Sequence, residues 1–157
     1  MKHCIFNKKD YSSGEGMLTS VWGPNLWHVL HTISFNYPIH PTNTEKKKYS
    51  LFIKSIQYVL PCKYCRTNLK KNLKVVKLTK HVMKNRDTFS RWVYQLHNHV
   101  NKMLGKTCTI SYLEIRDRYE HFRARCVSQK KQRGGHRKKK TKKKQHGGKK
   151  EKGCTKP

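Results

Sequence analysis

Acidic residues are scarce in this chain of 157 residues: 8 Asp and Glu stand against 37 Lys and Arg, which gives a formal net charge of +29 at pH 7. The imbalance is greatest near the C-terminus. Residues 127–157 hold 14 Lys and Arg, a single acidic residue (Glu151) and no aliphatic or aromatic side chain after Val127. Because such a segment cannot bury enough apolar surface to offset its chain entropy, we expect a disordered, Lys-rich tail.

The basic tail has three interpretations that composition leaves open. It can simply keep the protein soluble, or it can attach the protein electrostatically to nucleic acid or another anionic surface. An attachment of the second kind would weaken steeply with salt. The basic run 137–144 also resembles a nuclear address in composition.

Long apolar runs are absent as well. No stretch approaches the ~20 residues that a bilayer-spanning helix needs. Residues 1–10 lack the apolar core of a secretory signal. We therefore expect a protein that is made and kept in the cytosol, without a membrane partner. Six cysteines in that compartment favour redox or metal chemistry over a passive disulfide scaffold.

The alternation of apolar and polar residues that is typical of β-strands is missing over any comparable length. Apolar residues instead recur at helical spacing in five segments. We predict helices over about 21–37, 44–60 (with Thr44 as its N-cap), 62–76, 85–105 and 111–125. The expected fold is all-α, a four-helix bundle plus a short fifth helix. Residues 1–18 would form a flexible N-terminal arm, 19–126 the domain and 127–157 the tail.

One CxxC motif, Cys62 and Cys65, lies between Pro61 and the third predicted helix. A helix that begins here would direct its free N–H groups and positive dipole end at the sulfurs, which favours the thiolate. A zinc site normally needs a second such pair or a spaced His pair. A thioredoxin-like site needs a strand before the motif, and none is predicted. Zinc and a pair without function remain open, but the helix–CxxC–helix arrangement favours a dithiol beside a cofactor.

Two further pairs stand four residues apart on predicted helices, so the members of each pair share a helix face. They are Trp27 with His31 and His97 with Asn101. Each residue taken alone is as well explained by the core. Together, the two pairs could form two walls of one pocket for a dinucleotide between helices. Positive charge for its phosphates would come from two lysines further along the chain, Lys102 and Lys106.

Four motifs occur in a specific order and spacing along the chain: W-G-P-x-x-W-x-x-L-H at 22–31, the pair Tyr37-Pro38, the CxxC, and H-N-x-V-N within 92–106. Together they resemble the Erv/ALR family of FAD-linked sulfhydryl oxidases, most closely the short versions encoded by large cytoplasmic DNA viruses. The resemblance covers about residues 20–122. It implies an FAD-binding domain with these cofactor-binding residues: Gly23, Trp27, His31, Tyr37, Cys65, His97, Asn98, Val100, Asn101, Lys102, Leu104, Lys106, Arg118 and Tyr119.

The resemblance also implies an activity. Cys62 would exchange with the dithiols of substrate proteins, and Cys65 would be the charge-transfer thiolate that adds to the flavin. Electrons would pass from FAD to O₂, giving hydrogen peroxide, while the substrate protein gains a disulfide bond. Family members usually pair as homodimers. The viral versions lead us to expect the host cytoplasm, at the viral factory, or the virion.

Three positions depart from the family pattern. Tyr119 stands where the fifth helix of the family commonly has Trp. Pro24 stands where the family often has Arg, so one cofactor contact is in doubt. Tyr94 stands where many members have a Cys, so the structural disulfide formed there cannot form in the usual way.

The route by which electrons reach Cys62 stays open. The family usually carries a shuttle dithiol on a flexible arm, whereas this chain offers single arm cysteines, Cys4 and Cys154, as possible shuttles. Cys108 and Cys126 flank the fifth helix, and their pairing is undecided. Without a shuttle, substrates would reach Cys62 directly. The alternative function is a basic, nucleic-acid-binding helical module whose CxxC is structural or binds zinc.

Overall fold

The computed structural model describes residues 14, 16–107 and 109–124, and the account that follows is confined to them. Five α-helices and one 3₁₀ turn occur in this part of the chain. They are α2 (Thr19–Phe35), α3 (Asn43–Val59), α4 (Lys63–Val75), η1 (Val82–Lys84), α5 (Arg86–Met103) and α6 (Tyr112–Glu120). The described residues contain no β-strand, only an isolated bridge between Gly16 and Cys62. The predicted all-α fold, with a bundle of four helices and a short fifth, is confirmed.

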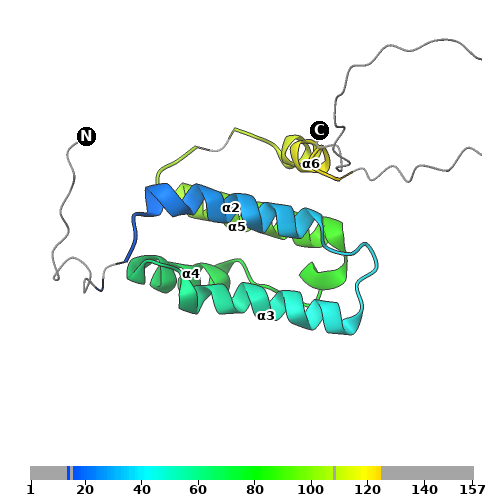
Figure 1. The fold of residues 1–157 in the computed structure, drawn as a ribbon, viewed down its shortest axis with the longest axis horizontal. Helices are drawn as coiled ribbons and strands as arrows, with labels where there is room; N and C mark the ends of the chain where they lie inside the picture. The colour runs from blue at the N-terminus through cyan, green and yellow to red at the C-terminus, as the bar shows by residue number, and fades with distance from the viewer. Residues whose placement is uncertain (1–13, 15, 108, 125–157) are drawn as a thin grey trace, which may run out of the picture.

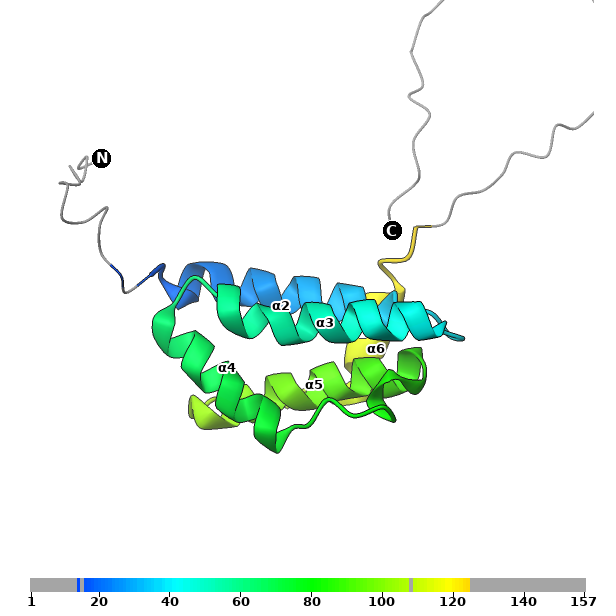
Figure 2. The same cartoon turned by 90° about the horizontal axis from the view of Figure 1, so that it is seen from below.

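The bundle consists of two layers (Figure 1). Helices α2 and α5 lie side by side and make the most extensive contact between elements, and α3 and α4 form the other layer. Helix α6 packs on α2, on the side away from α3 and α4 (Figure 1). Seen from below, α4 crosses from the end of α3 towards α5 and closes the bundle at one end (Figure 2). The CxxC lies at this closed end.

Most helices begin with a capping residue that satisfies free backbone N–H groups. Helix α3 is capped by Thr42, whose side chain accepts the N–H of Glu45 while the Glu45 carboxylate accepts the N–H of Thr42. This capping box corrects the predicted N-cap, Thr44: a Thr followed three residues later by Glu is the sequence signature of the motif. Asn85 and Ser111 begin α5 and α6 in the same way.

Helix α6 is shorter than predicted, because it ends at Glu120 and not near residue 125. His121 turns the chain back, and its ring contacts the carbonyl of Asp117. The turn brings Arg123 to the C-terminal end of α2, where its guanidinium donates to the carbonyl of Phe35 at 2.7 Å and pairs with Glu120. Contacts with α2, which the local sequence does not reveal, therefore end the helix.

The core between the layers is built from apolar residues of every bundle helix. Its fully buried centre includes Tyr37 and Phe89, whose rings meet edge to face at 5.0 Å between centroids. Trp92, Val93 and Leu96 contribute the buried face of α5 that the sequence predicts. Within the described residues, no helix is long and apolar enough to span a membrane. The predicted tail, most of the predicted N-terminal arm, Cys4, Cys108, Cys126 and Cys154 lie outside those residues.

Candidate functional site

Cys62 and Cys65 form a disulfide at the first turn of α4, with their Cα atoms 5.2 Å apart. Cys62 is the N-cap of the helix, and its sulfur accepts the N–H of Cys65 at 3.2 Å. The N-terminus of α4 therefore faces both sulfurs, as the sequence predicts. This arrangement stabilises negative charge on a sulfur once the bond is reduced.

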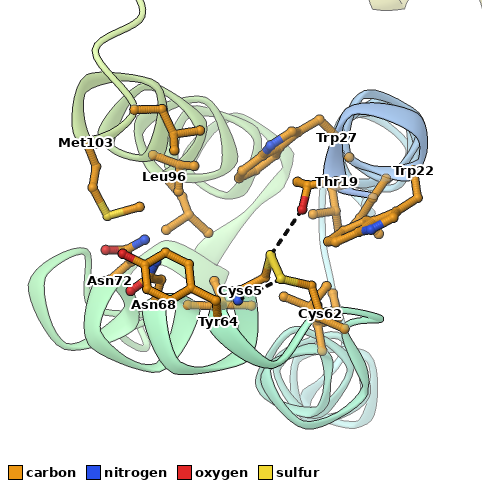
Figure 3. A pocket seen from close by; sticks show the side chains of 18 of the residues that line it. Thr19, Trp22, Trp27, Cys62, Tyr64, Cys65, Asn68, Asn72, Leu96 and Met103 are labelled. Carbon is orange, nitrogen blue, oxygen red and sulfur yellow. Dashed lines mark hydrogen bonds between the residues drawn. A yellow bond between two sulfur atoms is a disulfide. The ribbon is translucent and has the colours of Figure 1, made fainter. Parts of the chain in front are cut away.

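The disulfide forms part of the wall of a cavity of about 270 Å³. Figure 3 shows side chains of α2, α4 and α5 pointing into a common space, with the sulfurs at one edge. The walls of the cavity are largely apolar. Their apolar residues include Leu26, Trp27 and Leu30 of α2, Ile53 and Ile56 of α3, Leu60 after α3, and Leu96, Val100 and Met103 of α5. Such a slot suits a flat, apolar heterocycle.

A short strap before α2, residues 16–18, lies against the backbone of Pro61 and Cys62. The N–H of Met17 donates to the carbonyl of Pro61 at 2.6 Å, and Gly16 forms an antiparallel bridge with Cys62. Gly16 adopts a φ of +92°, and a Cβ there would overlap the carbonyl oxygen of Pro61 and lie 2.9 Å from the Cα of Cys62. Only glycine fits this close approach. These last residues of the predicted arm are thus bound to the domain.

Two side chains that follow the strap complete this wall. The indole N–H of Trp22 donates to the carbonyl of Met17 at 3.0 Å. The hydroxyl of Thr19, the first residue of α2, lies 3.4 Å from the sulfur of Cys65 (Figure 3). A hydroxyl so placed can donate a hydrogen bond to that sulfur.

Beyond the cavity, aromatic rings of α2, α5 and α6 form one continuous array. Trp27 and His97 stack face to face with centroids 4.1 Å apart and planes 7° apart. His97 Nδ1 is 3.0 Å from His31 Nε2, and His31 in turn meets the ring of Tyr119 at 5.3 Å. Tyr119 reaches His28 through its hydroxyl, at 3.1 Å. Three of the four predicted residues, Trp27, His31 and His97, therefore come together, but as one continuous array of rings and not as two facing walls. Asn101 is not part of this array.

The two histidines of this wall, His31 and His97, are electrically neutral over the physiological range. Burial, together with the nearby His97 and His28 rings, lowers the pKa of His31 to about 4. Burial and the charge of Lys106 lower the pKa of His97 to about 4. His31 Nδ1 is buried without a hydrogen-bond partner among the described residues. A buried nitrogen in that state costs folding free energy and marks a place where a bound group could supply a partner.

The predicted cofactor residues fall into three groups. Five line the cavity: Gly23, Trp27, Cys65, Val100 and Leu104. Five belong to the ring array or lie beside it: His31, His97, Tyr119, its neighbour Arg118, and Lys106, whose charge acts on His97. The other four lie elsewhere. Tyr37 is fully buried in the core, and its hydroxyl donates to the carbonyl of Met83. Asn98 and Lys102 line a separate hollow beside Trp92. The carbonyl of Asn101 accepts the N–H of Lys106 at the end of α5.

Three polar residues of the site were not predicted. Besides Thr19, they are Asn68 and Asn72, whose side chains line the otherwise apolar cavity (Figure 3). A signal for the two asparagines does exist in the sequence, since they follow Cys65 at helical spacing, one and two turns along α4. No such signal exists for Thr19, because its contact with Cys65 joins residues 46 positions apart.

A zinc-bound CxxC, the alternative function, finds no support in the described residues. The two sulfurs are bonded to each other, and no cluster of three or more His, Cys, Asp or Glu side chains occurs among residues 14, 16–107 and 109–124.

Comparison with known proteins agrees with this geometry. Residues 24–123 match the model of the Erv1 / Alr family. A probable FAD-linked sulfhydryl oxidase of Acanthamoeba polyphaga mimivirus is 39% identical over 85 residues, which are 54% of this chain and 59% of the relative. The FAD-linked sulfhydryl oxidase of African swine fever virus is 33% identical over 99 residues, 63% of this chain and 80% of the relative. The chain thus spans about three-fifths of the mimivirus relative.

Solved structures share the fold. The crystal structure of the FAD binding domain of Erv1 from Saccharomyces cerevisiae superposes with a TM-score of 0.58, at 26% identity, over 66% of this chain and 95% of that chain. The yeast Erv1 core gives a TM-score of 0.59 at 23% identity, over 75% of this chain and 96% of that chain. With the match over residues 24–123, these findings show that the chain belongs to the Erv1 / Alr family.

Proposed function

We propose that this protein is an FAD-linked thiol oxidase that introduces disulfide bonds into substrate proteins and uses O₂ as the final electron acceptor. The observation that carries the proposal is the Cys62–Cys65 disulfide in the wall of an apolar cavity. A redox-active disulfide needs a second redox group within contact distance to pass its electrons on. The relatives from mimivirus, African swine fever virus and yeast are each named as FAD-linked sulfhydryl oxidases.

The residues of the site fit FAD. The cavity offers an apolar slot beside the sulfurs, and Asn68 and Asn72 offer hydrogen bonds to the polar edge of a heterocycle. The stack of Trp27 and His97 offers a flat surface for a second ring, and the buried, unpaired His31 Nδ1 lacks a partner that a ligand could provide. When bound, FAD supplies a two-electron acceptor that can pass electrons to O₂, giving hydrogen peroxide.

The chain itself supplies the thiol–disulfide exchange. A thiolate of the substrate attacks the sulfur of Cys62, a new S–S bond forms, and the Cys62–Cys65 bond breaks with Cys65 leaving as a thiolate. A second substrate thiolate then attacks the mixed disulfide. This step releases the oxidised substrate and leaves Cys62 reduced, so two electrons have entered the cysteine pair. We assign the leaving role to Cys65 because its side chain packs against the core cluster, next to the cavity.

The surroundings of Cys65 stabilise the leaving thiolate. The N-terminus of α4 presents its positive dipole end, and the hydroxyl of Thr19 is within hydrogen-bond distance of the sulfur. Both favour the charged sulfur and therefore its departure from Cys62.

A homodimer is the assembly that we propose for this domain. Exposed apolar side chains on α2 and α3 support it, because unpaired surface of this kind is typical of protein interfaces. They include Val21, Val29, Leu51, Tyr58 and Val59, all of which are at least 47% exposed. The relatives from mimivirus and African swine fever virus support a viral origin. We propose on that ground that the protein acts in the host cytoplasm at the viral factory, or in the virion. Cys4 and Cys154 remain candidate shuttle cysteines.

The test is an absorption spectrum of the purified protein, followed by oxygen uptake with dithiothreitol. We expect flavin absorption bands, oxygen consumption, and hydrogen peroxide in proportion to the oxygen consumed. Cys65→Ser should retain the bound FAD and lose oxygen uptake, whereas Cys126→Ser should leave uptake of this small substrate unchanged. A folded, colourless protein that takes up no added FAD would refute the proposal, and so would turnover that survives Cys65→Ser.

A further inference from the structure

The half of the domain that contains α3, α4 and η1 is strongly basic, and among its described residues the one acidic side chain is Glu45, in the first turn of α3. From Lys46 to Arg86 the sequence contains 11 Lys and 2 Arg and no Asp or Glu. The other acidic residues of the described domain, Asp87, Glu114, Asp117 and Glu120, lie on α5 and α6. Helix α6 is on the far side of the bundle from α3 (Figure 1). The cations of this layer therefore have few counter-ions within the protein.

A groove of about 510 Å³ runs along α3 in this layer. One side is a helical stripe of polar residues, Asn43, Lys46, Lys47, Ser50 and Lys54, which recur every three or four positions and so share a face. The other side is the segment before α5, where Thr79 and Lys80 face the stripe across Leu78 and the buried Met83. Four ammonium groups thus line one concave surface.

These lysines are available to an external anion. Lys47, Lys54 and Lys80 are exposed and Lys46 is half-buried. The ion pairs of the described residues involve only arginines as cations, so none of the four lysines is neutralised by an acidic side chain within residues 14, 16–107 and 109–124. No acidic residue lines the groove.

The donor set favours phosphodiester groups. Lysines together with Ser, Thr and Asn side chains are the groups that typically contact the phosphates of nucleic acids. Lys47 and Lys54 stand seven residues apart, a rise of about 10 Å along the helix axis. That distance corresponds to the rise of about three phosphates of one strand of a duplex, at about 3.4 Å each along the duplex axis. The groove contains no exposed aromatic ring on which a base could stack, so binding would follow the backbone and not the sequence of bases.

We propose that this groove, formed by Lys46, Lys47, Lys54 and Lys80, binds the phosphate backbone of nucleic acid without sequence preference. The groove shares no lining residue with the cavity beside the disulfide, among the residues described. Both sites can therefore be occupied at once, and the groove would hold the folded domain on nucleic acid while Cys62 stays accessible. The site is formed by residues between Asn43 and Met83 and does not depend on the oxidase activity.

The test compares two full-length variants with equal loss of charge. In the groove variant, Lys46, Lys47, Lys54 and Lys80 are replaced by Gln. In the control, four exposed lysines of α4 are replaced by Gln: Lys63, Lys70, Lys71 and Lys74. Affinity for a fluorescein-labelled poly(dT) strand of about 20 nucleotides is measured by anisotropy over a range of salt concentrations. Circular dichroism confirms that both variants are folded.

We expect the groove variant to lose about tenfold or more in affinity at moderate salt, and the slope of log affinity against log salt to fall by about 2 to 3. The α4 control should change the affinity by less than about threefold. Equal losses in the two variants would overturn the proposal, because net charge alone would then explain the binding. Binding of poly-glutamate that depends on the groove, without such dependence for poly(dT), would overturn it in favour of an acidic polypeptide.

Discussion

The hydroxyl of Thr19 lies 3.4 Å from the sulfur of Cys65, at the point where the strap joins α2. This contact connects the first residue of one helix to the first turn of another, across the wall of the cavity (Figure 3). A hydroxyl donor stabilises a thiolate more than a thiol, because the charged sulfur is the better acceptor.

Replacing Thr19 by Val should therefore raise the pKa of the Cys65 thiol in the reduced protein. One hydrogen bond of about 1 kcal/mol corresponds to about 0.7 pH unit. The measurement is the pH dependence of iodoacetamide alkylation in the Cys62→Ser background, where Cys65 is the reacting thiol of the pair. Thr19→Ser keeps the hydroxyl and should keep the original pKa. An identical pH profile of alkylation for Thr19→Val and for the protein with Thr19 would contradict the hydrogen bond.

A second prediction concerns the strap. Gly16→Ala should detach it, since the added Cβ would collide with the backbone of Pro61 and Cys62 and the φ of +92° disfavours alanine. We expect the Met17 amide, which donates to Pro61, to exchange with solvent hydrogen faster in the variant. Gly14→Ala is the matched control, because a Cβ at Gly14 meets no atom within 4 Å. Unchanged protection of Met17 in Gly16→Ala would show that the strap is not held by this bridge.

The strap also illustrates how far the sequence could be interpreted. Helical periodicity and capping residues act within a few positions, so the five helices and the placement of Cys62 and Cys65 at a helix start were predictable. Gly14 and Gly16 indicated irregular structure, but the sequence does not distinguish between them. Only the close approach of Pro61, 45 residues away, gives Gly16 a role that Gly14 lacks.

The same limit explains the aromatic wall. The spacing of Trp27 and His31 on one helix, and of His97 and Asn101 on another, predicted that the members of each pair share a helix face. It could not predict that Trp27 stacks directly on His97, because that contact depends on how α2 and α5 pack. Tyr37 shows the converse: its complete burial and the hydrogen bond from its hydroxyl to the carbonyl of Met83 place it in the core, and the cofactor contact that the resemblance implies for it stays a prediction.

A third prediction concerns the pH dependence of stability without cofactor. The folded-state pKa of His31 is about 4, below the ordinary value of 6.5, so the unfolded chain binds more protons between these values. The contribution of His31 to the free energy of unfolding should therefore be fully present above about pH 6.5 and be lost as the pH falls towards about 4. The loss from His31 is on the order of 3 kcal/mol, and His97, which is more exposed, adds less.

Urea unfolding of the apoprotein between about pH 7 and about pH 4.5 measures this loss. His31→Phe keeps a ring beside Tyr119 and removes the titrating group, so the free energy of unfolding should depend less on pH. His81→Gln, a substitution on the surface, should reproduce the wild-type profile. An equally steep fall in His31→Phe and in the wild type would refute the assignment to His31.

The tyrosine that replaces a family cysteine gives a fourth prediction. The hydroxyl of Tyr94 donates to the carbonyl of Ile110 at 2.8 Å and so ties α5 to the segment that leads into α6. Tyr94→Phe should lower the free energy of unfolding by about 1 kcal/mol, the value of one hydrogen bond. Tyr58→Phe, on an exposed tyrosine of α3, should leave stability unchanged. Equal stability of Tyr94→Phe and wild type would show that this bond does not hold the segment.

A fifth prediction separates what the resemblance implies from what the geometry supports. Asn72 is buried and lines the cavity beside the disulfide, whereas Asn98, assigned to FAD by resemblance, lines a different hollow on α5. If a heterocycle occupies the cavity, Asn72 is placed to meet its polar edge and Asn98 is not. We therefore expect Asn72→Ala to weaken FAD binding about tenfold, or about 1.4 kcal/mol, and Asn98→Ala to change it less than about twofold. Quenching of flavin fluorescence on titration of the apoprotein gives both affinities. The reverse order would mean that the flavin lies along the other face of α5, and the cavity would then need another occupant.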